Sequence, residues 1–147
     1  MSRKPYKYKK KGTAQFIMVP HAILKSDAWR SCKPNARAVW IGLAMRFFGT
    51  NNGRIVYSCR EAAEHAGIGK NTAAKALEQL IEVGLIECIT ESSFDSRKKL
   101  AREWALTHIP VDGRPASGKW KEYKIKASPK LKRHSPIPDT GHLKVVS

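Results

Sequence analysis

Residues 58–86 read SCREAAEHAGIGKNTAAKALEQLIEVGLI, and local signals in this stretch define two helices. Ser58 lies three residues before Glu61, which is the spacing of a capping box and predicts that a short helix begins here. Small apolar residues continue this helix to Ala66. Gly67 then suits the left-handed conformation that commonly ends a helix. The first half of the stretch therefore predicts one short helix followed by a tight turn.

A second helix is predicted in the other half of the stretch. Gly69 can serve as its N-cap, the helix runs from Lys70 to about Val83, and Gly84 closes it. Apolar residues at helical spacing are predicted to face the core, namely Ala73, Leu77, Leu80 and Ile81. A glycine-containing turn and small alanines permit the two helices to pack closely.

The residues on either side extend this unit. Apolar residues at positions 36, 39, 40, 43, 44 and 47 form the stripe of an amphipathic helix that starts at Pro34 and ends before Gly49. Before it, a lead-in with apolar residues at 23, 24, 28 and 29 predicts a short helix packed on the core.

Strands are predicted after each of the longer turns. Residues 54–57 form one brief apolar segment, and residues 85–90 and 101–107 alternate in the manner of a hairpin with Trp104 and Leu106 buried. The order is helix, strand, helix, turn, helix, hairpin. This order predicts a mainly α fold with a small β-hairpin, of the α+β class.

Charge is concentrated at the two ends of the chain. The net charge is +16, of which residues 1–12 carry +6 and residues 113–147 carry +7. We therefore predict a folded domain at 13–112 between a basic N-terminal arm and a basic, proline-containing extension, both largely disordered, with one short strand at 123–125. So large an excess points to a polyanionic partner, most commonly nucleic acid and more rarely an anionic membrane surface.

Motifs for other functions are missing from the sequence. Three cysteines at wide spacing fit neither a disulfide framework nor a zinc site, and the five histidines have no metal-ligand spacing. No glycine-rich phosphate loop follows a strand, so we predict no enzyme activity, no metal and no cofactor. Apolar stretches fall well short of the roughly 18 residues that a membrane span needs. We expect a cytoplasmic, nucleoid-associated protein without a membrane partner.

The stretch 58–86 resembles the winged helix-turn-helix of bacterial transcription regulators and of plasmid or phage replication initiators. The resemblance is carried by Glu61-Ala62-Ala63, Gly67-Ile68, Thr72-Ala73, Leu77, Leu80 and Gly84-Leu85-Ile86. Together with the preceding helix and the hairpin it covers residues 34–107. It implies a helix-turn-helix at 58–83 and a wing hairpin at 85–107. Gly69 departs from the pattern, because such proteins often have Ser or Thr there.

The resemblance implies that helix 70–83 is a recognition helix lying in the major groove of double-stranded DNA. Asn71 can pair bidentately with adenine and Lys75 can donate to guanine, so these two residues are predicted to read bases. Lys70 and Thr72 lie in the first turn, where amide groups and the helix dipole favour a phosphate. Arg60, on the preceding helix, is a further phosphate candidate.

Basic residues outside these helices complete the predicted DNA-binding set. The wing tip carries Arg97, Lys98 and Lys99, and Arg102 begins the returning strand. A basic wing can lie along the minor groove or the backbone. The N-terminal arm is predicted to hold the backbone through Arg3, Lys4, Lys7, Lys9, Lys10 and Lys11.

These features together predict a sequence-specific double-stranded DNA-binding protein that acts as a transcription regulator. Three alternatives stay open: a plasmid or phage replication initiator or accessory protein, an RNA-binding or ribosome-associated module, and a protein-interaction domain whose tails bind an acidic partner. A homodimer is also open. It would have to form through the helix that starts at Pro34, the lead-in or the C-terminal extension.

Overall fold

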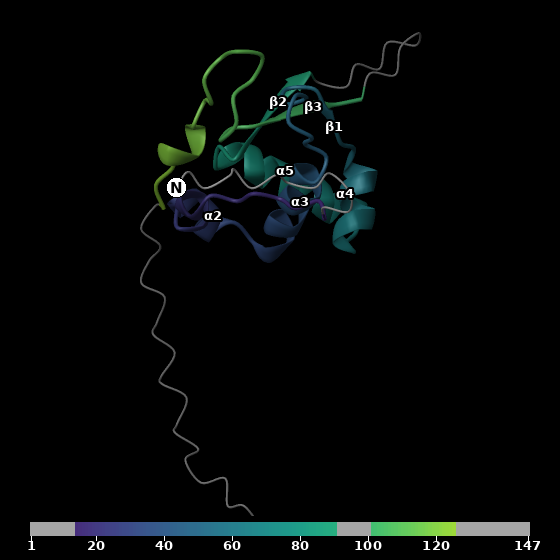
Figure 1. Cartoon of the computed structure of the whole chain (residues 1–147). Helices are drawn as coiled ribbons and strands as arrows, with labels where there is room; N and C mark the ends of the chain where they lie inside the picture. Colours follow the sequence, from purple (N-terminus) through teal and green to yellow (C-terminus); the bar gives the residue numbers. More distant parts are fainter. Residues whose placement is uncertain (1–13, 91–100, 126–147) are drawn as a thin grey trace, which may run out of the picture.

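The computed structural model describes residues 14–90 and 101–125 of the chain. Within these ranges it contains five α-helices, a three-stranded antiparallel sheet and one 3-10 helix (Figure 1). The elements are α1 His21–Leu24, α2 Asp27–Ser31, α3 Pro34–Ala44, β1 Ile55–Val56, α4 Cys59–Ala66, α5 Lys70–Glu82, β2 Ile86–Thr90, β3 Glu103–Leu106 and η1 Lys119–Lys121. The predicted combination of helices with a small antiparallel sheet is confirmed.

Two short helices form the lead-in, where the sequence predicts one. The hydroxyl of Ser26 accepts a hydrogen bond from Trp29 N (3.2 Å) and thereby starts α2 as a separate helix. Trp29 packs edge-on against Trp40 of α3, with ring centroids 5.3 Å apart. The guanidinium of Arg37 donates to the carbonyl oxygens of Trp29 and Arg30, each at 3.2 Å. These contacts fix the lead-in to α3.

Helices α3, α4 and α5 pack against one another in pairs and form the centre of the molecule (Figure 1). Trp40 and Leu43 from α3 are fully buried there, together with Leu77 and Leu80 from α5. The buried positions of α3 follow the predicted stripe as far as Ala44. The helical period of the sequence thus identified the core face of both long helices.

The C-terminal end of α3 differs from the prediction, because the helix stops at Ala44 rather than just before Gly49. The side chain of Asn51 accepts a hydrogen bond from Phe48 N (3.0 Å) and donates to the Arg46 carbonyl (2.9 Å). These two bonds hold the chain in a turn. Phe48 is consequently exposed instead of continuing the helix.

The signals around the α4–α5 turn are confirmed. Ser58 Oγ accepts from Glu61 N (3.1 Å), and the Glu61 carboxylate accepts from Ser58 N (2.8 Å), which completes the capping box. Gly67 has a φ of +66° and ends α4. One inward-facing prediction is wrong, since Ile81 is 42% exposed. It follows the buried Leu80 by one residue, which turns its side chain about 100° away from the core.

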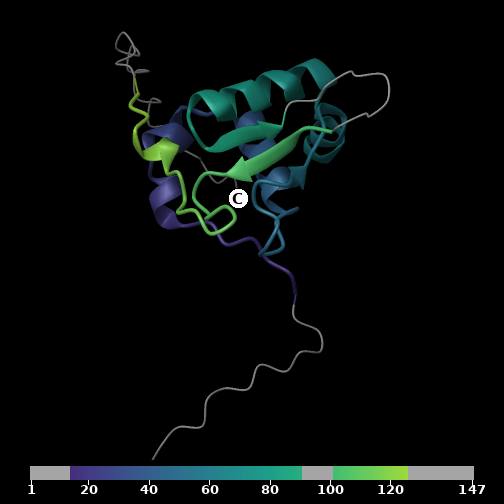
Figure 2. The same ribbon diagram turned by 90° about the horizontal axis from the view of Figure 1, so that it is seen from above.

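The sheet has the order β1-β3-β2, so β3 lies in the middle. Ile55 of β1 pairs with Trp104, and Ile86 of β2 pairs with Leu106. Trp104 and Leu106 are buried as predicted, and Trp104 Nε1 donates to the Tyr57 carbonyl (2.8 Å). β1 contains two residues rather than the four predicted. The sheet covers one side of the three-helix centre (Figure 2).

The chain after β3 folds back onto the molecule, and we call residues 107–125 the C-terminal strap (Figure 2). Trp120 in this strap is 9% exposed and belongs to the hydrophobic core. Further on, Ile125 N donates to the carboxylate of Asp27 in α2 (3.4 Å). The packed part of the chain therefore continues past residue 112, where the sequence predicts the start of a basic extension.

Gly84 makes the docking of the strap possible. A Cβ atom on this glycine would lie 2.8 Å from the Lys119 carbonyl carbon and 2.9 Å from Trp120 N. Thr107 also ties the strap down, because its hydroxyl donates to the Gly84 carbonyl (2.7 Å). The strand predicted at 123–125 is wrong, since these residues follow η1 without regular structure. Burial of the large Trp120 ring, rather than strand pairing, holds this segment.

Candidate nucleic-acid interface

Four of the predicted DNA-contacting residues share one surface of α5. Lys70, Asn71, Thr72 and Lys75 are all exposed, whereas the opposite side of the helix lies in the core. Asn71 and Lys75 are four residues apart, so their side chains project from the same face. We call residues 70–75 the basic end of α5.

The other half of this exposed face is acidic. Glu78 and Glu82 follow Lys75 at helical spacing, and both are exposed. A polyanion is attracted to lysine and repelled by carboxylate, and both effects act over the roughly 10 Å of a Debye length in moderate salt. The charge pattern therefore limits contact with a polyanion to the first two turns of the helix.

The backbone at the basic end is available to an anion. Gly69 caps α5 without a side-chain hydrogen bond, and the first intrahelical bond runs from Ala73 N to the Gly69 carbonyl (2.9 Å). The amides of residues 70–72 thus have no acceptor within the helix. Such amides, with the helix dipole behind them, form a ready anion site. In α4, by contrast, the capping box engages one of the corresponding amides, that of Glu61.

Arg60 lies in the first turn of α4 and is exposed, but its guanidinium already has a partner. It forms an ion pair with Glu64 one turn later, at 3.3 Å, and the two side chains are 83% and 69% exposed. Exposed pairs of this spacing contribute only about 0.3–0.5 kcal/mol. Arg60 can therefore exchange Glu64 for a phosphate at little cost.

The remaining predicted residues are only partly covered by the structure. Arg102 immediately precedes β3, and its side chain is exposed, while its carbonyl accepts a hydrogen bond from Tyr57 N (3.4 Å). The predicted wing tip, Arg97 to Lys99, and the N-terminal arm, residues 1–12, lie outside the described residues. The structure thus brings four predicted residues together on α5 and places two others on neighbouring elements.

The sequence did not identify one basic residue that has a structural role. Arg46, just after α3, forms an ion pair with Glu61 at 2.9 Å, and its guanidinium lies 5.1 Å from the centre of the Tyr57 ring. The hydrogen bond from Ser58 N, more than this ion pair, lowers the pKa of the Glu61 carboxyl. Arg46 therefore joins the end of α3 to the start of α4.

A second missed residue is Asn52, which the sequence indicates only as part of a turn. Its side chain is buried, with Nδ2 donating to the carbonyls of Leu106 (3.0 Å) and Ile109 (2.8 Å). Its Oδ1 accepts from Leu106 N (2.7 Å). One amide thus links the loop before β1 to the end of β3. No local signal could have found this, because the partners are more than fifty residues away.

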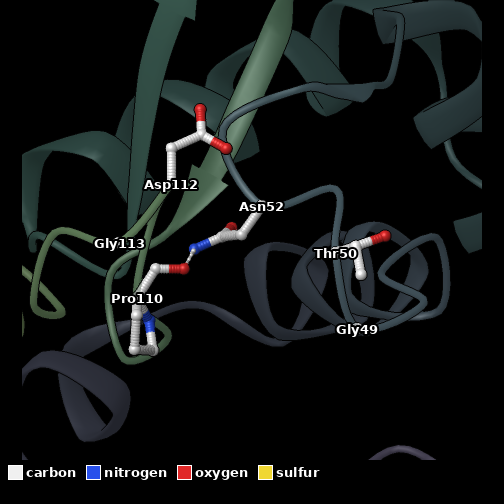
Figure 3. Close-up of a pocket in the computed structure, with 6 residues that line it drawn as sticks. All are labelled: Gly49, Thr50, Asn52, Pro110, Asp112 and Gly113. Atoms are coloured by element: carbon white, nitrogen blue, oxygen red, sulfur yellow. Dashed lines mark hydrogen bonds between the residues drawn. The ribbon is translucent and has the colours of Figure 1, made fainter.

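A shallow hollow of about 310 Å³ lies beside this loop (Figure 3). Its lining consists of Gly49, Thr50, Asn52, Pro110, Asp112 and Gly113. The Asn52 amide points to the Pro110 carbonyl (3.3 Å), and Asp112 accepts from Arg54 (3.1 Å). These polar groups serve the structure, so the hollow offers no evident catalytic arrangement.

Residues 14–90 and 101–125 give little support to a metal site, a nucleophilic cysteine or a membrane-spanning helix. No group of three or more His, Cys, Asp or Glu side chains in these ranges could hold a metal ion. Burial raises the pKa of the Cys32 thiol to about 11, so this thiol stays protonated at neutral pH and is a poor nucleophile. No helix in the described part of the chain is long and apolar enough to cross a membrane.

Comparison with known proteins adds no family to this picture. No family model matches the chain, and no curated protein or solved structure matches it significantly. Its function must therefore be inferred from the residues and their geometry.

Proposed function

We propose that the folded part of this chain is a winged helix-turn-helix and that the protein is a sequence-specific double-stranded DNA-binding protein, acting as a transcription regulator. The observation that carries this proposal is the basic end of α5. It combines unpartnered backbone amides with exposed Lys70, Asn71, Thr72 and Lys75 on the outside of a three-helix centre.

The dimensions of an α-helix support this use of α5. The major groove of B-DNA is about 12 Å wide, which admits one helix with its side chains. In this arrangement Asn71 and Lys75 face base edges, and Lys70 and Thr72 contact phosphate. The acidic Glu78 and Glu82 on the later turns stay outside the groove. This matches the general geometry in which the N-terminal residues of a recognition helix contact the bases.

The overall charge supplies affinity that does not depend on sequence. The described ranges contain 14 Lys and Arg against nine Asp and Glu, a net charge of +5 out of +16. Most of the excess thus belongs to residues outside these ranges, and above all to the arm. Binding through such charges releases counterions and weakens steeply with salt.

The test is a selection of bound sites from randomised duplex DNA at near-physiological salt, with the full chain and three variants. Asn71→Ala should relax the preference at one or two positions, since a bidentate base contact discriminates by about 1–3 kcal/mol. Lys70→Ala should weaken binding to all DNA sequences alike and reduce the salt slope of binding by about 1. Lys33→Ala, which removes an exposed lysine outside α5, is the matched control and should leave the motif unchanged.

The outcomes separate the competing functions. A single enriched motif that Asn71→Ala flattens would support the proposal, and a promoter carrying that motif should respond to the protein. A bound pool without any motif would refute sequence-specific recognition. Stronger binding to folded RNA than to duplex DNA at equal salt would refute it in favour of an RNA-binding role.

A further inference from the structure

A second group of basic side chains gathers where the C-terminal strap meets α2. η1 packs on α2, and Ile125 N donates to the Asp27 carboxylate (3.4 Å). This docking places the strap segment that carries Lys121 and Lys124 against α2, which carries Arg30, although the two segments are far apart in the sequence. All three side chains are exposed. We call these three residues the strap patch.

The acidic groups at this surface compensate the patch only in part. The Asp27 carboxylate accepts the hydrogen bond from Ile125 N, and the Glu87 carboxylate pairs with Lys119. Glu122 is exposed and offsets one positive charge. The strap patch therefore keeps an excess of positive charge.

The fold holds the strap patch in place. Trp120 is buried, while Lys119 and Lys121 on either side of it are exposed. The ammonium group of Lys121 lies 5.5 Å from the centre of the Trp120 ring. Gly84 permits the close approach of this segment to the end of α5. Charges that are fixed before binding lose less conformational entropy when they bind.

The strap patch and the basic end of α5 lie at opposite ends of the molecule, as η1 and α4 do in both views (Figures 1 and 2). α5 has 13 residues, so its two ends are about 20 Å apart. Glu78 and Glu82 are exposed on the turns between the two basic surfaces. Their charge disfavours a single backbone that runs along α5 from one surface to the other.

We infer that the strap patch is a second nucleic-acid contact, which binds the phosphate backbone of a second duplex segment while α5 reads the first. The inference rests on the proposed function, because α5 must hold the first segment. Lys and Arg bind phosphate without reading sequence, so the second segment needs no specific site. A single copy of the protein thus bridges two duplexes.

A capture experiment with the full chain tests this inference. Beads carry a duplex with the selected motif, and a labelled duplex without the motif is added with the protein. The patch variant is Lys121→Gln with Lys124→Gln. The charge-matched control is Arg54→Gln with Arg114→Gln, which removes two exposed cations outside the strap patch: Arg114 in the first part of the strap, and Arg54 before β1, which pairs with Asp112 of the strap. Far-UV circular dichroism confirms that both variants fold.

The wild type and the control should capture the labelled duplex, and the patch variant should capture much less. Loss of two phosphate contacts should make the salt slope of capture shallower by about 1.8. Between 50 and 200 mM salt, the affinity of the patch variant for the labelled duplex should therefore fall about tenfold less than the affinity of the wild type. Binding of the motif duplex alone should stay within about twofold, because the basic end of α5 is unchanged.

Three results would overturn the inference. Capture by the patch variant equal to that by the wild type would refute the strap patch while leaving the proposed function intact. An equal loss in the patch variant and the control, relative to the wild type, would show that only total charge matters. Failure of the wild type to bind any duplex at low salt would refute the strap patch and the proposed function together.

Discussion

Replacing Gly84 by alanine should loosen the C-terminal strap, whereas the same change at Gly67 should not. Both glycines follow a helix and have positive φ, +80° at Gly84 and +66° at Gly67. A methyl group at Gly84 would lie 2.8–2.9 Å from backbone atoms of Lys119 and Trp120. At Gly67 it would meet no heavy atom within 4 Å. The pair therefore separates a steric effect from the conformational effect that both share.

The two losses of stability can be estimated from this geometry. Left-handed backbone costs an alanine about 1 kcal/mol, so Gly67→Ala should destabilise by about that amount. At Gly84 the neighbours are backbone atoms, which no rotamer change can move. Overpacking of this kind adds about 1–3 kcal/mol, for a total of about 2–4 kcal/mol. In a domain of this size 1 kcal/mol lowers Tm by about 4–8 °C.

Urea unfolding followed by far-UV circular dichroism would measure both free energies of unfolding. Tryptophan fluorescence in the absence of urea would report whether Trp120 has left its buried position in Gly84→Ala. Equal destabilisation by the two substitutions, with unchanged fluorescence, would refute the close approach between Gly84 and the strap.

Three further substitutions test other parts of the fold. Asn52→Ala should lower the free energy of unfolding by about 3 kcal/mol in urea unfolding, because it leaves the buried N–H and carbonyl of Leu106 without their hydrogen-bond partner. Asn51→Ala, which removes more exposed bonds, should cost about 1 kcal/mol, and a similar loss in both would count against the role of Asn52. Burial lowers the pKa of His108, so protonation of this imidazole favours the unfolded chain. The contribution of neutral His108 to the free energy of unfolding should be fully present above about pH 6.5 and should be lost as the pH falls through the pKa of the folded state. His108→Gln should flatten this decline in thermal scans at stepped pH, and an unchanged profile would argue against it. Gly69→Ser should raise the free energy of unfolding by a few tenths of a kcal/mol and so raise Tm slightly, since Gly69 is extended and a side chain there has room to cap α5. A lower Tm would contradict the N-cap geometry of α5.

The helices were predictable where their signals are local. The capping box at Ser58 and the glycine at position 67 act within a few residues, so they fix the ends of α4 without reference to the rest of the chain. The period of α5 likewise identified its core face and therefore its exposed face. The candidate residues on α5 could be named for the same reason.

The missed features depend on partners that are distant in the sequence. Asn52 has the look of a turn residue, and its buried role follows only from the position of β3. Trp120 stands among lysines with no apolar period around it, so nothing nearby indicates burial. Its place in the core requires Gly84, which the sequence indicates only as the end of a helix.

The two glycines that flank α5, Gly69 before it and Gly84 after it, have opposite consequences for this helix. Gly69 leaves the first amides without a cap, which lowers stability by a few tenths of a kcal/mol but keeps an anion site open. Gly84 lets the strap cover the other end, where Trp120 contributes buried apolar surface. The strap thus anchors the C-terminal end of α5, whereas the backbone amides without a partner lie at its N-terminal end. Because the helix is rigid over its length, anchoring one end also fixes the orientation of the other, which is what recognition of a groove by Asn71 and Lys75 would require.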